Sequence, residues 1–180
     1  MAETGAALTS IDLSVELIGE ANKQPHTNIA YCVGDIERVS FADSVFDAVV
    51  GSSILHHVDT EQVLREAFRV LKPGGSVAFA EPNMLNPQIA LQKNIPLIKR
   101  WLGDSPDETA FIRWKVRRML AGVGFVDVYA DPYDFLHPLV PPVFIPFVQF
   151  VGDVLESTPV VREFAGSIIM WGRKPASQAT

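Results

Sequence analysis

The chain has 180 residues, of which 48% are hydrophobic and 20% charged, so it can bury a sizeable core and is not a disordered segment. Its formal net charge of -6 argues against non-specific nucleic-acid binding, which needs a basic face. The one cysteine, Cys32, excludes an intramolecular disulfide. Because Cys32 lies in an apolar run, we expect a buried thiol in a reducing cytoplasm. The first residues, MAETGAALTS, lack the basic start and apolar core of a signal peptide, so we expect a cytoplasmic protein.

The first part of the chain alternates between strand and helix patterns. ALTSI (7–11) predicts a strand, and a helix should follow from Ser14, a suitable N-cap, to about Asn22. NIAYCVG (28–34) is apolar and β-branched enough to be a strand buried on both faces. FDAVVGSS (46–53) predicts a third strand, because its centre is continuously apolar.

A helix with clear boundaries is expected next. Asp59 is a suitable N-cap, and Gln62 three residues later gives a start that resembles a capping box. The apolar residues that follow fall on one helical face: Val63, Leu64, Ala67, Phe68 and Leu71. KPGG (72–75) should stop the helix with a turn, and SVAFAEP (76–82) predicts a fourth strand.

The rest of the chain is less regular. Residues 83–107 contain several helix breakers, and ETAFIRWKVRRMLAGVG (108–124) predicts an amphipathic helix that ends in glycine. FVDVYADPY (125–133) and SIIMWGRK (167–174) predict two last strands, which could form an antiparallel hairpin at one edge. Strands that alternate with helices predict an α/β fold with a mostly parallel sheet. Since no linker or repeat is present, we expect a single domain over residues 1–180.

Two runs in this series carry a resemblance to a known family: GDIERVSFADSVFDAVVGSSILHHV (34–58) and EAFRVLKPGGSVAFAEPN (66–83). They are similar to class I S-adenosylmethionine-dependent methyltransferases, most closely to the small-molecule and quinone-type group. The resemblance covers about residues 7–130 and the last strand. It rests on an acid after strand two, Gly-Asp after strand three, FD-x-V at strand four and LKPGG at strand five. It implies a Rossmann-like sheet, S-adenosyl-L-methionine as cofactor and methyl transfer to a small, hydrophobic acceptor.

The resemblance implies a cofactor site at the strand ends. Asp12, with Leu13 beside it, would accept hydrogen bonds from the ribose hydroxyls; the alternative is a helix N-cap carboxylate. Asp35 would accept from the adenine amino group while Ile36 packs on the ring; the alternative is an ordinary Gly-Asp turn.

Four further residues complete the implied site. Ser52 and Ser53 would line the methionine part of the cofactor, unless they are only a strand end. His56 and His57 are either structural or in contact with the substrate or cofactor. Adjacent residues point in different directions, so the two histidines are a poor chelate and no metal site is expected. Methyl transfer depends mainly on alignment and exclusion of water, so the sequence indicates no catalytic residue by motif.

An apolar insert, residues 135–166, separates the last two strands. Its most apolar stretch, residues 138–152, is too short to span a bilayer, which takes roughly 20 residues, and Pro138, Pro141, Pro142 and Pro146 would break a helix. It could pack over the sheet as core, line an acceptor pocket, form a dimer contact or lie at a membrane surface. No Lys or Arg occurs in it before Arg162, so membrane binding is disfavoured.

The chain departs from the family at its start. The family's glycine-rich loop, acid-x-G-x-G-x-G after strand one, has no counterpart, since Gly122 and Gly124 come too late. We therefore expect an N-terminally truncated fold that lacks the central strand one. Strands two and four would then pair directly, or a second copy would fill the gap in a strand-swapped homodimer, or the region would fold poorly. The alternative function is a non-catalytic remnant that acts as a binding or oligomerisation module.

Overall fold

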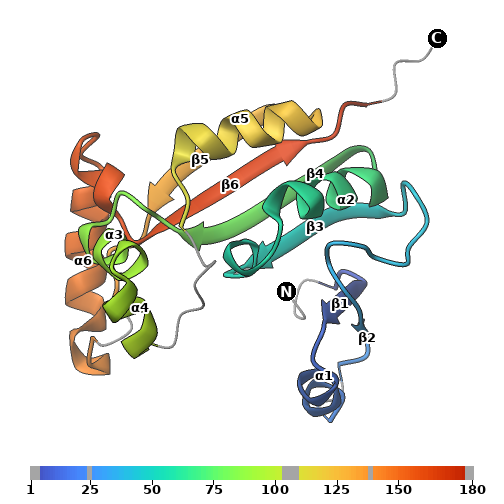
Figure 1. Ribbon diagram of the computed structural model, residues 1–180, viewed down its shortest axis with the longest axis horizontal. Coiled ribbons are helices and arrows are strands. Elements are labelled where there is room, and N and C mark those ends of the chain that lie inside the picture. Colours follow the sequence, from blue (N-terminus) through green and yellow to red (C-terminus); the bar gives the residue numbers. More distant parts are fainter. Residues whose placement is uncertain (1–4, 24–25, 103–109, 138–139, 177–180) are drawn as a thin grey trace. The chain divides into compact units, whose positions relative to one another are not determined.

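The computed structural model describes residues 5–23, 26–102, 110–137 and 140–176 (Figure 1). Their contacts divide the chain into two compact units, residues 1–42 and 43–180, and each unit has its own sheet. The expectation that both belong to one domain stays a prediction.

The first unit is a strand–helix–strand motif. β1 (Leu8–Asp12) and β2 (Ile29–Val33) pair in parallel, and α1 (Val15–Ala21) connects them. As predicted, α1 begins after Ser14, whose side chain accepts a hydrogen bond from the backbone N of Leu17 at 3.1 Å. The predicted burial of the second strand is wrong for this unit, because Val33 is exposed and Cys32 is only half-buried. Two strands with one short helix leave part of the sheet surface uncovered.

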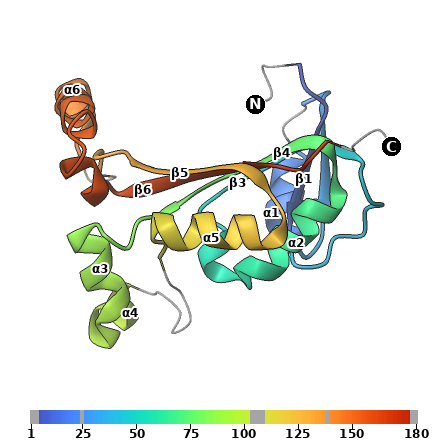
Figure 2. The same ribbon diagram turned by 90° about the horizontal axis from the view of Figure 1, so that it is seen from above.

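The second unit is built on a four-stranded mixed sheet in the order β3-β4-β6-β5 (Figures 1 and 2). β3 (Phe46–Ser52) and β4 (Leu71–Pro82) are parallel, and the connection between them contains α2, as a strand–helix–strand crossover does. β6 (Ser167–Arg173) is antiparallel both to β4 and to β5 (Val126–Tyr133). The predicted α/β class and the antiparallel closing strand are therefore confirmed.

Two helices lie along one face of this sheet (Figure 2). α2 (Thr60–Val70) begins as predicted after Asp59, whose carboxylate accepts from the backbone N of Gln62 at 3.1 Å. α5 (Arg113–Val123) ends at Gly124, which has the left-handed φ of 113° that glycine adopts without strain. The helix begins later than expected, because the backbone of Phe111 is already bonded to the segment that follows β4.

The KPGG segment belongs to β4, so the prediction of a separate turn after the helix is wrong. β4 begins immediately where α2 ends. β4 advances from Leu71 to Ser76 while its partner β3 advances only from Phe46 to Ala48. The surplus residues form a bulge in which Gly74 has a φ of +81°.

The core of this unit lies between the sheet and the two helices. Inward side chains alternate along β4 and β6, as they do in any strand. The buried residues of these layers include Val63, Leu64, Ala67, Val77, Phe79, Val116, Leu120, Ile168 and Met170. The register places Val50, Tyr129 and Ile169 on the other face of the sheet, where they are exposed.

Two short helices occupy the region that was expected to be irregular. α3 (Pro87–Asn94) and α4 (Pro96–Leu102) lie with the insert at the same end of the sheet (Figures 1 and 2). Both begin with proline, which lacks an N–H donor that a first helical residue does not need. The prolines expected to break helices here begin them instead.

The insert between β5 and β6 is also helical where it is described. It contains η3 (Pro142–Phe144), α6 (Ile145–Glu156) and η4 (Val161–Phe164). The prolines do not prevent α6, because Pro146 stands in its first turn. The large apolar residues of its outer face, and of the turn before it, are exposed: Val143, Phe147, Phe150 and Val154. The interpretation that the insert packs entirely as core is wrong for this face. No helix in the described ranges has the length and apolarity needed to cross a membrane.

Candidate functional site

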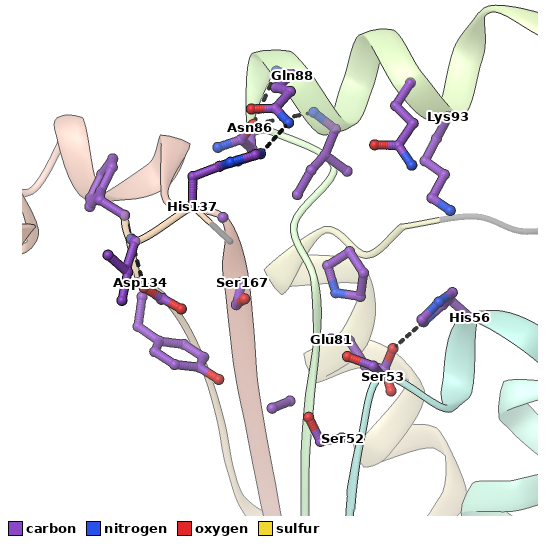
Figure 3. A pocket seen from close by; sticks show the side chains of 18 of the residues that line it. Ser52, Ser53, His56, Glu81, Asn86, Gln88, Lys93, Asp134, His137 and Ser167 are labelled. Carbon is purple, nitrogen blue, oxygen red and sulfur yellow. Dashed lines mark hydrogen bonds and ion pairs between the residues drawn. The ribbon is translucent and has the colours of Figure 1, made fainter. Parts of the chain in front are cut away.

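A cleft of about 710 Å³ opens in the second unit where β3 and β4 end (Figure 3). The carboxyl ends of parallel strands are the usual ligand-binding edge of α/β sheets. Strand ends, η2 (Leu55–His57), α3 and residues 133–137 line the cleft. Ser52, Ser53, His56 and His57 all lie on its wall, so the structure brings these four predicted site residues together.

Glu81, at the end of β4, is the central buried group of this cleft. Its side chain is fully buried, and one oxygen, Oε1, accepts hydrogen bonds from the backbone N of Ile54 (2.9 Å) and of Leu55 (2.8 Å). The other oxygen, Oε2, lies 2.8 Å from Nδ1 of His56. The carboxylate therefore caps η2 and holds the histidine at the same time.

The two histidines are neighbours on η2 but differ in their surroundings. Their ring centroids are 3.9 Å apart with the planes at 41°. The His56 side chain is 9% exposed and bonded to Glu81, whereas His57 is exposed. In the described part of the chain, no three His, Cys, Asp or Glu residues are placed to hold a metal ion.

Ser52 and Ser53 form the turn from β3 into η2. Both side chains are exposed at the cleft, and Ser53 has a positive φ of 53°. The backbone N of Ser53 donates to the carbonyl oxygen of Ala80 at 2.8 Å, which fixes this turn against β4. Small side chains at this turn leave room for a ligand beside the backbone.

The other predicted cofactor residues lie in the first unit. Because β1 and β2 are parallel, Asp12 and Asp35 stand at the same edge of their sheet, with Asp12 opposite Val33. Oδ1 of Asp12 accepts from the backbone N of Ser14 at 2.8 Å, and Oδ1 of Asp35 accepts from that of Glu37 at 2.8 Å. Within the described residues, Oδ2 of each carboxylate makes no hydrogen bond.

The neighbours of these carboxylates are partly open to solvent. Leu13 is exposed and Ile36 is half-buried. Since Ser14 caps α1, the alternative in which Asp12 is the N-cap is wrong. Asp35 does form a local turn with Glu37, so its turn role and its implied cofactor role coexist.

Further polar residues face the cleft from the side opposite to the histidines. Burial raises the pKa of Tyr133, the negative charges of Asp134 and Glu156 raise it further, and a hydrogen bond with Ser167 opposes the shift. Tyr133 therefore keeps its phenolic proton at neutral pH. Nε2 of His137 lies 2.8 Å from Nε2 of Gln88, which links the 133–137 segment to α3 across the cleft (Figure 3).

Sequence reasoning missed Glu81 although the sequence contains a clue to it. Glu81 continues the inward series of Val77 and Phe79 along β4. A carboxylate on a buried strand face needs partners, so its presence there indicates a buried polar site. Gln88 and His137 come from segments in which no strand or helix was expected, and no such clue points to them.

Three comparisons with known proteins bear on the family. A family model for the methyltransferase domain matches residues 1–79. The demethylmenaquinone methyltransferase of Mycolicibacterium paratuberculosis is 31% identical over 145 residues, which cover 70% of this chain and 61% of that protein. The ubiquinone/menaquinone biosynthesis C-methyltransferase of Desulfotalea psychrophila is 33% identical over 144 residues, with 69% and 58% covered. The chain thus spans about 60% of the length of these relatives.

The fold is similar to that of a solved methyltransferase. Phosphoethanolamine N-methyltransferase 2 of Haemonchus contortus, solved in complex with S-adenosyl-L-methionine, superposes with a TM-score of 0.62 at 15% identity. The match covers 97% of this chain and 44% of that one. The parallel β3–β4 pair agrees with the Rossmann-like sheet that the resemblance implies, and the closing strand is antiparallel. The chain belongs to the class I S-adenosylmethionine-dependent methyltransferase family.

Proposed function

We propose that this protein transfers a methyl group from S-adenosylmethionine to a small, hydrophobic acceptor of the quinol type. The observation that carries the proposal is the cleft at the carboxyl ends of β3 and β4, in a chain of the methyltransferase family. The quinol class is taken from the relatives, which are named for demethylmenaquinone and for ubiquinone and menaquinone biosynthesis.

The chemistry of the predicted cofactor residues fits S-adenosylmethionine. When bound, this cofactor supplies a methyl group on a positively charged sulfur. Oδ2 of Asp12 and of Asp35 would accept hydrogen bonds from the ribose hydroxyls and the adenine amino group. The aliphatic side chains of Leu13 and Ile36 lie beside these carboxylates in the sequence and would flank the adenosine. Ser52 and Ser53 would leave room for the methionine part.

The acceptor would lie in the cleft between the histidines and α3. The apolar residues Pro82, Ile89, Phe135 and Leu136 line it together with polar groups. A mixed lining suits a ring that is apolar on its faces and carries hydroxyl groups at its edge. This division of the lining supports an aromatic acceptor over a fully polar one.

Methyl transfer to a quinol tests this proposal. The protein is incubated with S-adenosylmethionine carrying a tritiated methyl group and with reduced 1,4-naphthoquinone, and the organic extract is analysed for labelled product by chromatography and mass spectrometry. We expect a product heavier by one CH₂, and its formation should be inhibited by S-adenosylhomocysteine. Absence of labelled product from quinol, phenol and amine acceptors, with folded protein, would contradict the proposal.

A role as an oligomerisation module is the second candidate, favoured by the exposed apolar face of α6. Val143, Phe147, Phe150 and Val154 repeat at helical spacing and are exposed. Apolar surface of this kind is uncommon on monomers, so a homodimer through this face, with strand exchange as one form of it, is part of the proposal. The cytoplasmic location expected from the sequence belongs to the same proposal.

A further inference from the structure

We propose that His56, oriented by Glu81, is the base that removes a proton from the acceptor. The acceptor would accordingly be a molecule whose reacting group carries a weakly acidic proton, such as a phenol or an enol. This inference rests on the proposed methyl transfer and goes beyond it, because methyl transfer as such requires no base.

The first step concerns the proton on His56 Nδ1. Oε1 of Glu81 accepts from two backbone N–H groups, and the side chain is fully buried. The remaining oxygen, Oε2, faces Nδ1 of His56 at 2.8 Å. A carboxylate can only accept, so the proton in this contact belongs to Nδ1. The contact therefore fixes the tautomer of His56 as well as the orientation of its ring.

The second step concerns the opposite nitrogen, Nε2. His56 lines the cleft, and in the described part of the chain Nε2 makes no hydrogen bond. The only enclosed side-chain nitrogen or oxygen without a partner in those residues is Oε2 of Glu163. Nε2 is therefore not enclosed, and with Nδ1 held by Glu81 it is the ring nitrogen left to meet an acceptor in the cleft. Figure 3 shows the His56 ring beside Glu81, with the dashed line that marks their contact.

A purely structural role explains only part of this arrangement. The Glu81 carboxylate caps η2 through Ile54 and Leu55, and the histidine gives Oε2 a partner. A residue that only had to satisfy Oε2 would need a single hydrogen-bond donor. It would not need a second ring nitrogen at a ligand cleft. In hydrolase triads, one nitrogen of the histidine ring likewise contacts a buried carboxylate and the other contacts the reacting group. The carboxylate orients the ring and stabilises the imidazolium.

The reaction that follows is balanced in protons and electrons. The acceptor's proton goes to Nε2 of His56, and the electron pair left on the acceptor forms the new bond to the methyl carbon. The pair of the broken sulfur–carbon bond stays on sulfur, which becomes neutral. The imidazolium lies beside the Glu81 carboxylate, which stabilises its charge until the proton is lost to water. Glu81 is in this account a positioning residue and His56 a catalytic one.

The tautomer is tested without any acceptor or cofactor. Nitrogen-15 NMR of the histidine rings, with His56 assigned by its loss in His56→Asn, should show the neutral ring protonated at Nδ1. Glu81→Gln should remove this preference. A neutral ring protonated at Nε2 in the unmodified protein would overturn the assignment of Nε2 as the base. This measurement is independent of whether the protein transfers methyl groups.

The catalytic role is tested with two acceptors of different acidity, reduced 1,4-naphthoquinone and 4-nitrophenol. His56→Asn should lower kcat for the quinol by about 10²–10⁴-fold. It should change kcat for the more acidic nitrophenol, which is already ionised at pH 8, by much less. The asparagine amide can still donate to Glu81, so the fold is kept, and a control at the exposed pair Arg65–Glu61, Arg65→Gln, should leave both rates unchanged.

The outcomes separate this inference from the proposed function. Titration of S-adenosylmethionine by calorimetry should give the same affinity for the unmodified protein and His56→Asn. If the cofactor does not bind to either, the proposed function fails, while the NMR result still decides the tautomer. If it binds, equal losses of rate for both acceptors, an unchanged rate with the quinol, or no transfer to either acceptor would overturn the inference.

Discussion

The Nζ atom of Lys174 lies 2.7 Å from the carbonyl oxygen of Phe68 and 4.9 Å from the centre of the Phe68 ring. The same ammonium group donates to the carbonyl oxygen of Leu71 at 2.7 Å. A residue directly after the last strand thereby satisfies carbonyl groups that the end of α2 leaves without helical partners. This contact joins two segments that are about a hundred residues apart in the chain.

Replacing Lys174 by methionine should lower the free energy of unfolding by about 1–3 kcal/mol, because part-buried carbonyls lose a charged donor. Urea denaturation measures the change. Lys72→Met is the matched control, since Nζ of Lys72 makes an exposed ion pair with Asp47, worth about 0–1 kcal/mol. Equal effects of the two substitutions would show that the buried cap contributes nothing.

Gly75→Ala should destabilise the fold by about 1–3 kcal/mol. A Cβ atom on Gly75 would lie 2.9 Å from the carbonyl oxygen of Lys72 and 3.0 Å from that of Asp47, and both are backbone atoms of the bulge. Gly122→Ala is the control in the same unit, because nothing lies near its Cβ position in α5 and alanine favours a helix by about 1 kcal/mol. Thermal unfolding should shift in opposite directions for the two variants; a rise for Gly75→Ala would contradict the bulge geometry.

The sequence predicted each strand of the described residues, because each contains a short apolar run, although β4 begins at Leu71 and not at Ser76 as expected. It also predicted the starts of α1 and α2, since Ser14 and Asp59 act through bonds to residues three positions away. It could not predict α3, α4 and α6. The prolines that argue against a helix interior are compatible with a first turn, and only the structure shows which position they take.

Only those residues of the candidate site that follow a predicted strand could be predicted from the sequence. The end of β3 and the residues just after it include Ser52, Ser53 and the two histidines. Because ligand clefts form at the carboxyl ends of parallel strands, the strand pattern places these residues at one cleft. Glu81 acts through backbone N–H groups 26 and 27 residues away, and long-range pairing of this kind has no local pattern. The same holds for the Gln88–His137 bond.

Alkaline pH should weaken the fold through two tyrosines. A hydrogen bond to Asp131, burial and the charge of Asp131 raise the pKa of Tyr129, and burial first of all raises that of Tyr133. A folded-state pKa above the unfolded value of about 10 means that this stabilisation is complete below pH ~10 and is lost as pH rises through the folded-state value.

Replacing both tyrosines by phenylalanine tests this pH dependence. The fall of the unfolding free energy between about pH 9 and pH 11 should be shallower in the double variant than in the unmodified protein. Urea denaturation at a series of pH values measures it, with the region around pH 7 as the internal reference. A fall of the same steepness in both proteins would contradict the assignment.

The exposed face of α6 should make the protein self-associate. Replacing Phe147 and Phe150 by serine removes the two largest exposed side chains of that helix and should convert a dimer into a monomer. Light scattering coupled to gel filtration gives the mass directly. A monomeric mass for the unmodified protein would exclude the dimer, and a dimer that survives both substitutions would place its contact elsewhere.

Binding of S-adenosylmethionine tests the central claim most directly, and isothermal titration calorimetry measures it. The account predicts binding with a Kd on the order of 1–100 μM. Asp12→Asn should weaken it by about 10–100-fold, because a charged acceptor for the ribose hydroxyls is lost. Asp47→Asn, at an exposed carboxylate paired with Lys72, should leave the affinity unchanged. No heat of binding at millimolar cofactor, with folded protein, would contradict the assignment of this chain as a working methyltransferase.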